Sequence, residues 1–292
     1  MIGSYLRCVA TASLVVVAAT PLARGESGAA RYVRYSFTVE NTRNVSATGI
    51  VLYVQLPVCQ AVRQRTLDFK VVPEAEVLRD GAGNQVACVV LPFLPPLGSR
   101  LVEIEARLDH AAQDPGLQSG DEPRDYLRPE EWIESEAPEI KKQAAEAPAG
   151  DARETARWFF DFIRAKIRVK DIDPADRGAL WALQHEQGDC TELAYLFVAL
   201  CRARGIPARV LGGYRCDGNC VLAAAGYHNW AEFHDGRAWV IVDLALGDWD
   251  VQEPRYVLMK VHTPAPDERT GFFHRARLVA PEGVEARMNG LR

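Results

Sequence analysis

Hydrophobic and polar residues alternate along the chain from about residue 32 to residue 108. The alternating runs are rich in β-branched and aromatic residues and are separated by Asn, Gly and Pro, which is the pattern of short strands joined by turns. They cover residues 32–39, 49–56, 85–91 and 100–108. The sequence from Asp80 to Asn84 has the composition of a hairpin connection. We therefore predict a β-sandwich domain over residues 30–110.

The pattern then changes from alternation to a helical period. Residues 111–125 are polar and contain Gly and Pro, which is typical of a linker. Apolar positions three or four residues apart then predict helices near residues 156–167, 180–183 and 193–201, and strand-like runs follow at 208–214, 228–234 and 238–246. We expect residues 126–292 to form a second domain, of mixed α and β structure.

The first 25 residues have a different composition from the rest. Arg7 precedes an uncharged apolar run over residues 8–19, and the small residues Ala23 and Gly25 follow. This order is typical of a cleaved secretory signal. The alternative is an anchoring helix, but the run is shorter than the roughly 20 residues that span a bilayer. We expect residues 1–25 to be a signal peptide, and the mature protein to be periplasmic or secreted with no membrane span.

Composition narrows the range of partners. The 292 residues are 48% hydrophobic and 25% charged, with a formal net charge of −5, which is ordinary for a soluble globular chain of two domains. The sequence has no block of Lys and Arg that would attract a nucleic acid or an anionic membrane surface. We predict no nucleic-acid partner.

Export places the cysteines in an oxidising compartment. One arrangement forms two disulfides, Cys59 with Cys88 and Cys216 with Cys220. It leaves Cys190 and Cys201 as free thiols. The alternative is that all six are reduced, and the sequence does not decide between the two.

Candidate chemistry appears at the start of the third predicted helix. Asp189 is a favourable N-cap and Glu192 stands three residues later, which predicts a capping box with Cys190 at the first helical position. The helix dipole and the unpaired backbone N–H groups there stabilise a thiolate. A small core residue is the alternative reading of Cys190.

The last two predicted strands supply partners for this thiol. If Asp235-Gly236 is a two-residue turn, His228 lies directly across the hairpin from Asp243, and Trp230 lies across from Ile241. Directly opposed side chains have Cβ atoms about 5 Å apart, so a carboxylate could orient the imidazole. Together with the helix-start thiol, this predicts a nucleophile, a base and an orienting carboxylate.

Five segments in this order resemble the transglutaminase-like superfamily. They are Gly188–Glu192, Leu200–Arg209, Gly213–Tyr214, His228–Glu232 and Trp239…Asp243. The resemblance implies a papain-like α+β fold, in which a Cys-bearing helix packs on an antiparallel sheet, preceded here by the β-sandwich. It implies that Cys190 is the nucleophile, His228 the base and acid, and Asp243 the orienting residue. One departure is Leu244, where the family often has proline.

The resemblance also implies a chemistry. A Cys190 thiolate would attack the carboxamide or peptide bond of a protein or peptide and form a thioester, without a cofactor. An amine acceptor would make the protein a transglutaminase, whereas water would make it a protease or amidase. The backbone N–H of Cys190 and the side chain of Gln184 are candidate oxyanion donors, with an exposed helix glutamine as the alternative for the latter.

The remaining candidate residues carry weaker signals. Arg209, Tyr214 and Trp230 are candidates for lining the substrate cleft, with ordinary packing as the alternative for each. Cys216 and Cys220 followed by a single histidine lack a zinc spacing, so we predict no metal site. A catalytically silent module that binds peptides or cell-envelope polymers on the same fold is the second functional hypothesis.

Overall fold

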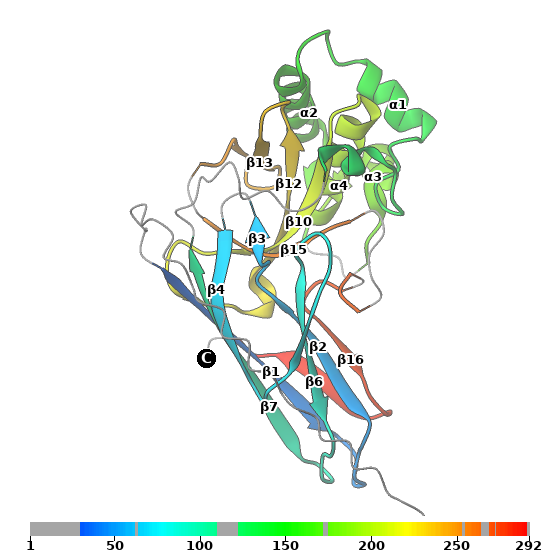
Figure 1. Cartoon of the computed structure of the whole chain (residues 1–292). Coiled ribbons are helices and arrows are strands. Elements are labelled where there is room, and N and C mark those ends of the chain that lie inside the picture. Colours follow the sequence, from blue (N-terminus) through cyan, green and yellow to red (C-terminus); the bar gives the residue numbers. More distant parts are fainter. Residues whose placement is uncertain are drawn as a thin grey trace, which may run out of the picture.

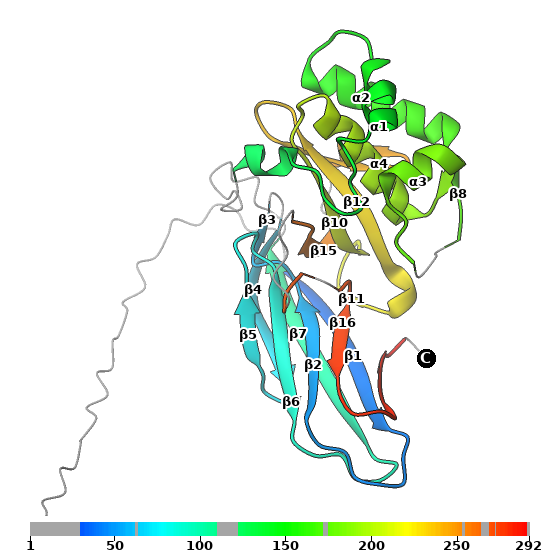
Figure 2. The same ribbon diagram turned by 90° about the vertical axis from the view of Figure 1, so that its right-hand side faces the viewer.

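A computed structural model describes residues 30–61, 64–109, 122–171, 175–252, 255–263, 269–271 and 273–290. The expected signal peptide and most of the expected linker lie outside these residues. In the described part, no helix is long and apolar enough to cross a membrane. Figures 1 and 2 show long strands without helices at one end of the molecule, and the helices together with further strands at the other.

Two sheets pack face to face at the strand-rich end. The first has the order β11-β1-β7-β4-β3, with β17 also paired to β1, and the second has the order β16-β2-β6-β5. The strands of the first sheet are β1 (Arg31–Asn41), β3 (Gln60–Ala61), β4 (Gln64–Val72), β7 (Ser99–Asp109), β11 (Cys220–Val221) and β17 (Val284–Met288). Those of the second are β2 (Ile50–Leu56), β5 (Glu76–Arg79), β6 (Gln85–Leu91) and β16 (Ala276–Val279).

The apolar residues of the alternating pattern in the sequence form the core of this sandwich. Every second residue of β1 from Val33 to Val39 is buried, because successive side chains of a strand point to opposite faces. Apolar residues of β2, β6 and β7 join the same cluster. The predicted β-rich N-terminal region is therefore confirmed.

The chain returns to the sandwich at its C-terminal end. β16 pairs with β2 and β17 pairs with β1, both antiparallel. The predicted second domain over residues 126–292 did not include this return, because local periodicity identifies a strand but does not identify its partner. The boundary near residues 110–126 stays a prediction.

Helices and a third, antiparallel sheet form the other end. The helices are η1 (Pro123–Leu127), α1 (Pro138–Ala145), α2 (Ala152–Lys166), α3 (Gly178–His185), α4 (Cys190–Ala203) and η2 (Ala224–Gly226). The sheet has the order β14-β13-β12-β10-β15, and β8 (Arg168–Val169) pairs separately with β9 (Gln187–Gly188). The strands of the sheet are β10 (Ala208–Arg215), β12 (Tyr227–His234), β13 (Trp239–Asp243), β14 (Asp248–Trp249) and β15 (Tyr256–Val261).

Helix α4 is the centre of this end. Its residues from Thr191 to Arg202 are all buried, as expected for a helix that is covered on every side. The apolar face of the sheet packs on it through Ala231, Phe233 and Val242, and residues of α1, α2 and α3 cover the rest. This arrangement confirms the predicted α+β class with a Cys-bearing helix on an antiparallel sheet.

The cysteines follow part of the predicted arrangement. Cys216 and Cys220 form a disulfide, and Cys190 and Cys201 are free thiols, as in the first of the two arrangements left open by the sequence. The predicted pairing of Cys59 with Cys88 is wrong, because both are free. In the β2–β6 register Cys88 lies opposite Tyr53, six residues before Cys59. Cys59 lies beyond the end of β2, and its backbone N–H donates to the carbonyl of Gly83 (2.9 Å), five residues before Cys88.

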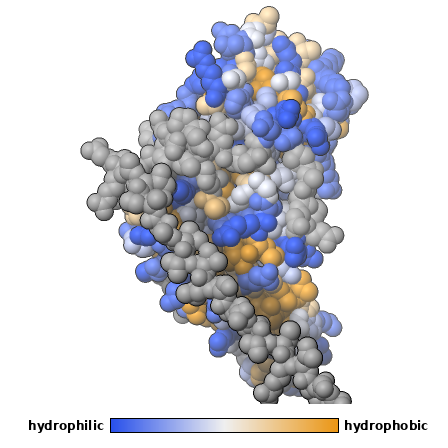
Figure 3. Space-filling model, in the orientation of Figure 1, coloured by the Kyte–Doolittle hydropathy of each residue, from blue (hydrophilic) through white to orange (hydrophobic). Residues whose placement is uncertain are grey.

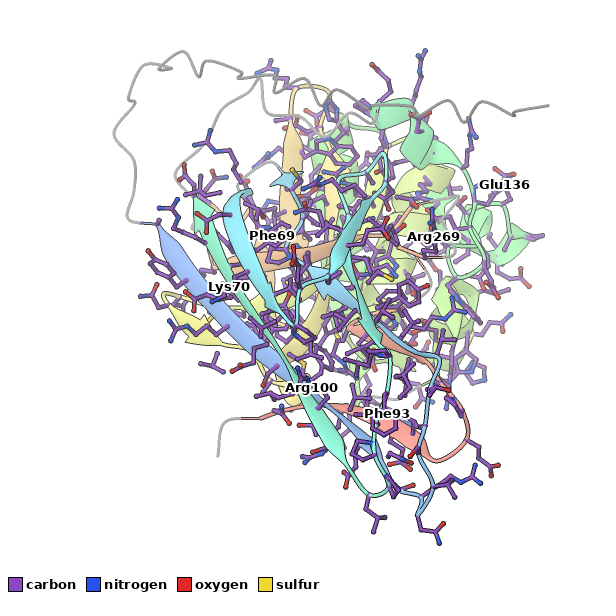
Figure 4. All side chains as sticks on the ribbon, turned by 60° about the horizontal axis from the view of Figure 1, so that its bottom comes forward. Phe69, Lys70, Phe93, Arg100, Glu136 and Arg269 are labelled. Atoms are coloured by element: carbon purple, nitrogen blue, oxygen red, sulfur yellow. A yellow bond between two sulfur atoms is a disulfide. The ribbon has the colours of Figure 1, made fainter. Side chains whose placement is uncertain are left out.

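Most of the exposed large apolar side chains belong to the sandwich, where they interrupt the polar surface seen in Figure 3. Figure 4 places one of them, Phe93, near the end of the sandwich away from the helices. Phe93 is 53% exposed, whereas Phe197 on α4 is 0% exposed and packs edge-on against Phe233 at a centroid distance of 6.0 Å.

Replacing Phe197 with alanine is expected to lower the free energy of unfolding by about 3–5 kcal/mol, because the change leaves a cavity beside α4. Phe93→Ala serves as the matched control, and we expect it to change the free energy by less than about 0.5 kcal/mol. Urea unfolding followed by circular dichroism measures both. Equal losses in the two variants would contradict the central place given to α4.

Candidate active site

The start of α4 has the predicted capping box. The Asp189 side chain accepts a hydrogen bond from the backbone N–H of Thr191 (2.7 Å), and Glu192 Oε2 accepts from the backbone N–H of Asp189 (3.0 Å). Both acidic side chains are buried, and burial raises the pKa of Glu192. Glu192 also accepts from the backbone N–H of Arg177 (3.3 Å). Cys190 is therefore held at the first helical position.

The hairpin that carries His228 and Asp243 has a different register from the predicted one. Ala231 pairs with Val242 and Glu232 with Ile241, so Asp243 is not directly opposite His228. The reason is the loop, which spans Asp235 to Ala238 rather than two residues. The Asp235 carboxylate accepts from the backbone N–H groups of Arg237 and Ala238, both at 2.9 Å.

The shift moves the pairing by two residues, which preserves the face on which each side chain lies. His228 and Asp243 still share a face and meet diagonally. His228 Nε2 lies 2.6 Å from Asp243 Oδ2, so the predicted pair forms in spite of the wrong register.

Asp243 is completely buried, at 0% exposed, and its carboxylate is surrounded by donors. Oδ2 accepts from the hydroxyl of Tyr256 (2.8 Å) as well as from His228, and Oδ1 accepts from the backbone N–H of Leu246 (3.1 Å). Hydrogen bonds to the charged form are what make a buried carboxylate tolerable.

His228 connects this carboxylate to the thiol. Burial by itself lowers the pKa of His228, but a hydrogen bond to Asp243, a second one to Cys190 and the negative charges of both partners raise it to about 10. Since Nε2 faces Asp243, Nδ1 is the nitrogen left for Cys190. The arrangement favours a protonated imidazole beside Cys190, and a cation next to a cysteine is the setting in which such side chains act as nucleophiles.

Two of the residues predicted to line the substrate cleft, Arg209 and Tyr214, are buried. Arg209 is 1% exposed, forms a 2.9 Å ion pair with Glu232, and places its guanidinium over the ring of Trp239 at 4.2 Å. Tyr214 is 4% exposed and packs in the sandwich core. Arg209 and Tyr214 therefore pack inside the protein and do not line a cleft.

Trp230 and Gln184 have different outcomes. Trp230 is buried, lies beside His228 with ring centroids 6.3 Å apart, and packs on Tyr256 at 4.5 Å. Trp230 therefore packs beside His228 and does not line an open cleft. Gln184 is exposed on α3, and its role as an oxyanion donor stays a prediction.

Sequence reasoning missed two contacts of the site. Tyr256 lies on β15, beyond the last recognisable segment, and only the order of the strands brings it to Asp243. Asn229 Nδ2 donates to Thr191 Oγ1 (2.9 Å), which ties the histidine-bearing strand to the first turn of α4. The position of Asn229 beside His228 was the only available signal. Among the residues with described positions, no group of three or more His, Cys, Asp or Glu could hold a metal ion.

Comparison with known sequences identifies this end of the molecule. Residues 139–244, which contain the thiol, the imidazole and the carboxylate, match the family model of the transglutaminase-like superfamily. This region is a transglutaminase-like domain. No curated protein sequence matches the chain at a significant level.

One solved structure shows the same fold for the domain and the sandwich together. A putative cysteine protease from Cytophaga hutchinsonii is similar over 89% of this chain and 93% of its own, with 17% identity and a TM-score of 0.59. The periplasmic domain of TgpA from Pseudomonas aeruginosa is similar over 72% of this chain and 87% of that chain, with 15% identity and a TM-score of 0.37. The first likeness establishes the shared fold.

Replacing Asp243 with asparagine is expected to lower the pKa of His228 by at least about one unit from about 10, because a neutral amide no longer opposes the effect of burial. NMR titration of the His228 ring, assigned with His228→Gln, measures it. Asp161→Asn, an exposed change on α2, is the control. An unchanged titration in Asp243→Asn would contradict the assignment of Asp243 as the partner.

The same raised pKa sets a pH dependence of stability. The unfolded value of histidine is about 6.5. The stabilisation by protonated His228 is therefore fully present below about pH 6.5 and is lost as the pH rises through about 10. Urea unfolding across this range is expected to show a decrease that is smaller in Asp243→Asn than in the native protein.

Proposed function

We propose that this protein is an exported cysteine enzyme that transfers the acyl group of a carboxamide or peptide bond through Cys190, His228 and Asp243. The observation that carries the proposal is the connected series of contacts, from thiol to imidazole to a buried carboxylate 2.6 Å from the ring. The transglutaminase-like fold, whose relatives include cysteine enzymes, supports the same reading.

The first step consumes the thiolate. Cys190 Sγ attacks the carbonyl carbon and forms a C–S bond, while His228 gives its proton to the departing nitrogen as the C–N bond breaks. Ammonia leaves from a glutamine-type carboxamide and an amine leaves from a peptide. The backbone N–H of Cys190 is a natural donor to the oxyanion, because helix-start amides have no partner within the helix.

The second step resolves the thioester. Neutral His228 takes a proton from water or from an amine, that nucleophile attacks the carbonyl carbon, and the C–S bond breaks to restore the thiolate and imidazolium. Water makes the overall reaction a hydrolysis, and an amine makes it a transamidation. Asp243 stabilises the imidazolium at the start and end of each cycle.

The substrate class is inferred from the acyl-transfer chemistry and from the expected export. We propose a protein or peptide substrate in the periplasm or outside the cell, with an amine as the alternative acceptor to water. The N-terminal composition supports export.

A catalytically silent binding module is the second candidate. The feature that favours catalysis over it is the raised pKa of His228, since a module that only binds has no need for a base coupled to a thiol.

Cys190 is expected to react with limiting iodoacetamide near neutral pH at least about tenfold faster than the buried thiol Cys201, because an imidazolium stabilises its thiolate. Burial raises the pKa of Cys201, which makes it an internal control. Peptide mass spectrometry locates the label. His228→Ala is expected to slow labelling of Cys190 alone, and an inert Cys190 in the native protein would favour the binding module.

Analysis of the products identifies the acceptor of the acyl group, which is either water or an amine. The protein is incubated with glutamine-containing peptides, with and without a primary amine, and Cys190→Ala is the control. Hydrolysed peptide or released ammonia without amine would establish a hydrolase, whereas amine incorporation would establish a transferase.

A further inference from the structure

Strand β15 connects the candidate active site to the N-terminal sandwich. It is the edge strand of the catalytic sheet, paired on one side with β10. Near its start, Tyr256 donates to the same Asp243 oxygen that faces His228. Tyr256 and Leu258 are two residues apart and belong to one buried cluster, so they lie on one face of the strand.

The open side of β15 is completed by side chains of the sandwich. Gln64 Oε1 accepts from the backbone N–H of Leu258, and Gln64 Nε2 donates to the carbonyl of Leu258, both at 2.8 Å. The backbone N–H of Val58 donates to the same carbonyl (2.9 Å). The Gln64 amide thus makes the pair of hydrogen bonds that a neighbouring strand would make.

A second amide repeats this pairing three residues further along. Asn84 Oδ1 accepts from the backbone N–H of Val261 (2.7 Å), and Asn84 Nδ2 donates to its carbonyl (2.9 Å). Gln64 and Asn84 are both buried, so an unpaired amide at either place would be costly. The two pairs fix the position of β15 along the sandwich.

We propose that Tyr256 is a positioning residue for Asp243 and that the sandwich holds it in place through Gln64. Tyr256 touches no substrate atom in this assignment. Its hydroxyl holds the carboxylate at the angle from which it accepts the hydrogen bond of His228, and its ring is held against Trp230. The sandwich then contributes to the chemistry of the site as well as to the stability of the chain. This inference rests on the function proposed above.

The decisive experiment is the pH dependence of Cys190 labelling by iodoacetamide in Tyr256→Phe, which removes one hydroxyl and keeps the ring. A looser Asp243 supports the imidazolium less well, so labelling is expected to begin about one pH unit higher and to be about tenfold slower below the native midpoint. Tyr35→Phe is the matched control, because it removes another buried hydroxyl, whose partner is the Gln55 carbonyl in the sandwich.

The readouts separate this role from a merely structural one. Loss of thermal stability with an unchanged labelling midpoint would overturn the proposal. A shift to lower pH would overturn it too, because Tyr256 would then be weakening the Asp243–His228 bond rather than aligning it. If Tyr35→Phe also shifts the labelling midpoint by about one pH unit, the effect is a general result of destabilisation, and the proposal is overturned.

The sandwich is tested with Gln64→Met, which keeps the length of the side chain and removes the amide. We expect labelling to slow by about three- to tenfold, and the double variant with Tyr256→Phe to be little slower than Tyr256→Phe alone, since both changes act on one contact. Gln55→Met, which removes a buried amide bonded to the Thr270 carbonyl, is the control. Fully additive effects would overturn the coupling through Gln64.

The parent proposal has its own control in the same assay. If Cys190 is labelled as fast in His228→Ala as in the native protein, the proposed catalytic function fails. If His228→Ala slows it and Tyr256→Phe behaves like the native protein, only the positioning role fails.

Discussion

The burial of the Asp243 carboxylate is the constraint on which the site depends. A charge removed from water is stable only when hydrogen-bond donors replace the solvent. The donors around Asp243 are His228 on β12, Tyr256 on β15 and the backbone of Leu246 beyond β13. Three parts of the sheet must therefore be in place at once. The same contacts raise the pKa of His228, so the structure that satisfies the carboxylate also makes this histidine strongly basic.

The thiol is placed by a second constraint, which is the burial of α4. The helix cannot slide or rotate without disturbing the core on every side, and its capping box fixes where it begins. The bond from Asn229 to Thr191 then ties that beginning to the strand of the histidine. The Cys190 thiol and the His228 imidazole belong to different elements, and their contact depends on the packing of the whole helical end.

The features that could be predicted from the sequence are those that depend on a few residues close together in the chain. A capping box depends on Asp189 and Glu192, three residues apart, and it was found as predicted. The His228–Asp243 contact was predicted from a wrong turn. It survived because an error of two residues leaves side chains on the same face.

Features that depend on distant pairing were not predicted. Tyr256 reaches Asp243 only because β15 follows β10 in the sheet, and β16 and β17 join the sandwich from far along the chain. The Cys59–Cys88 error has the same origin, since the offset between two strands cannot be read from either one.

The amides of Gln64 and Asn84 suggest why sandwich and catalytic sheet occur together in this chain. An edge strand presents unpaired backbone groups that favour pairing with other chains, and proteins cover such edges or interrupt them. Here the cover comes from the sandwich: two side-chain amides and the backbone N–H of Val58 reach the backbone of Leu258 and Val261, in place of another strand. A side-chain amide pairs at one position only, so it fixes register where a continuous strand would permit slippage. The arrangement that protects the edge of the catalytic sheet therefore also determines where Tyr256 stands.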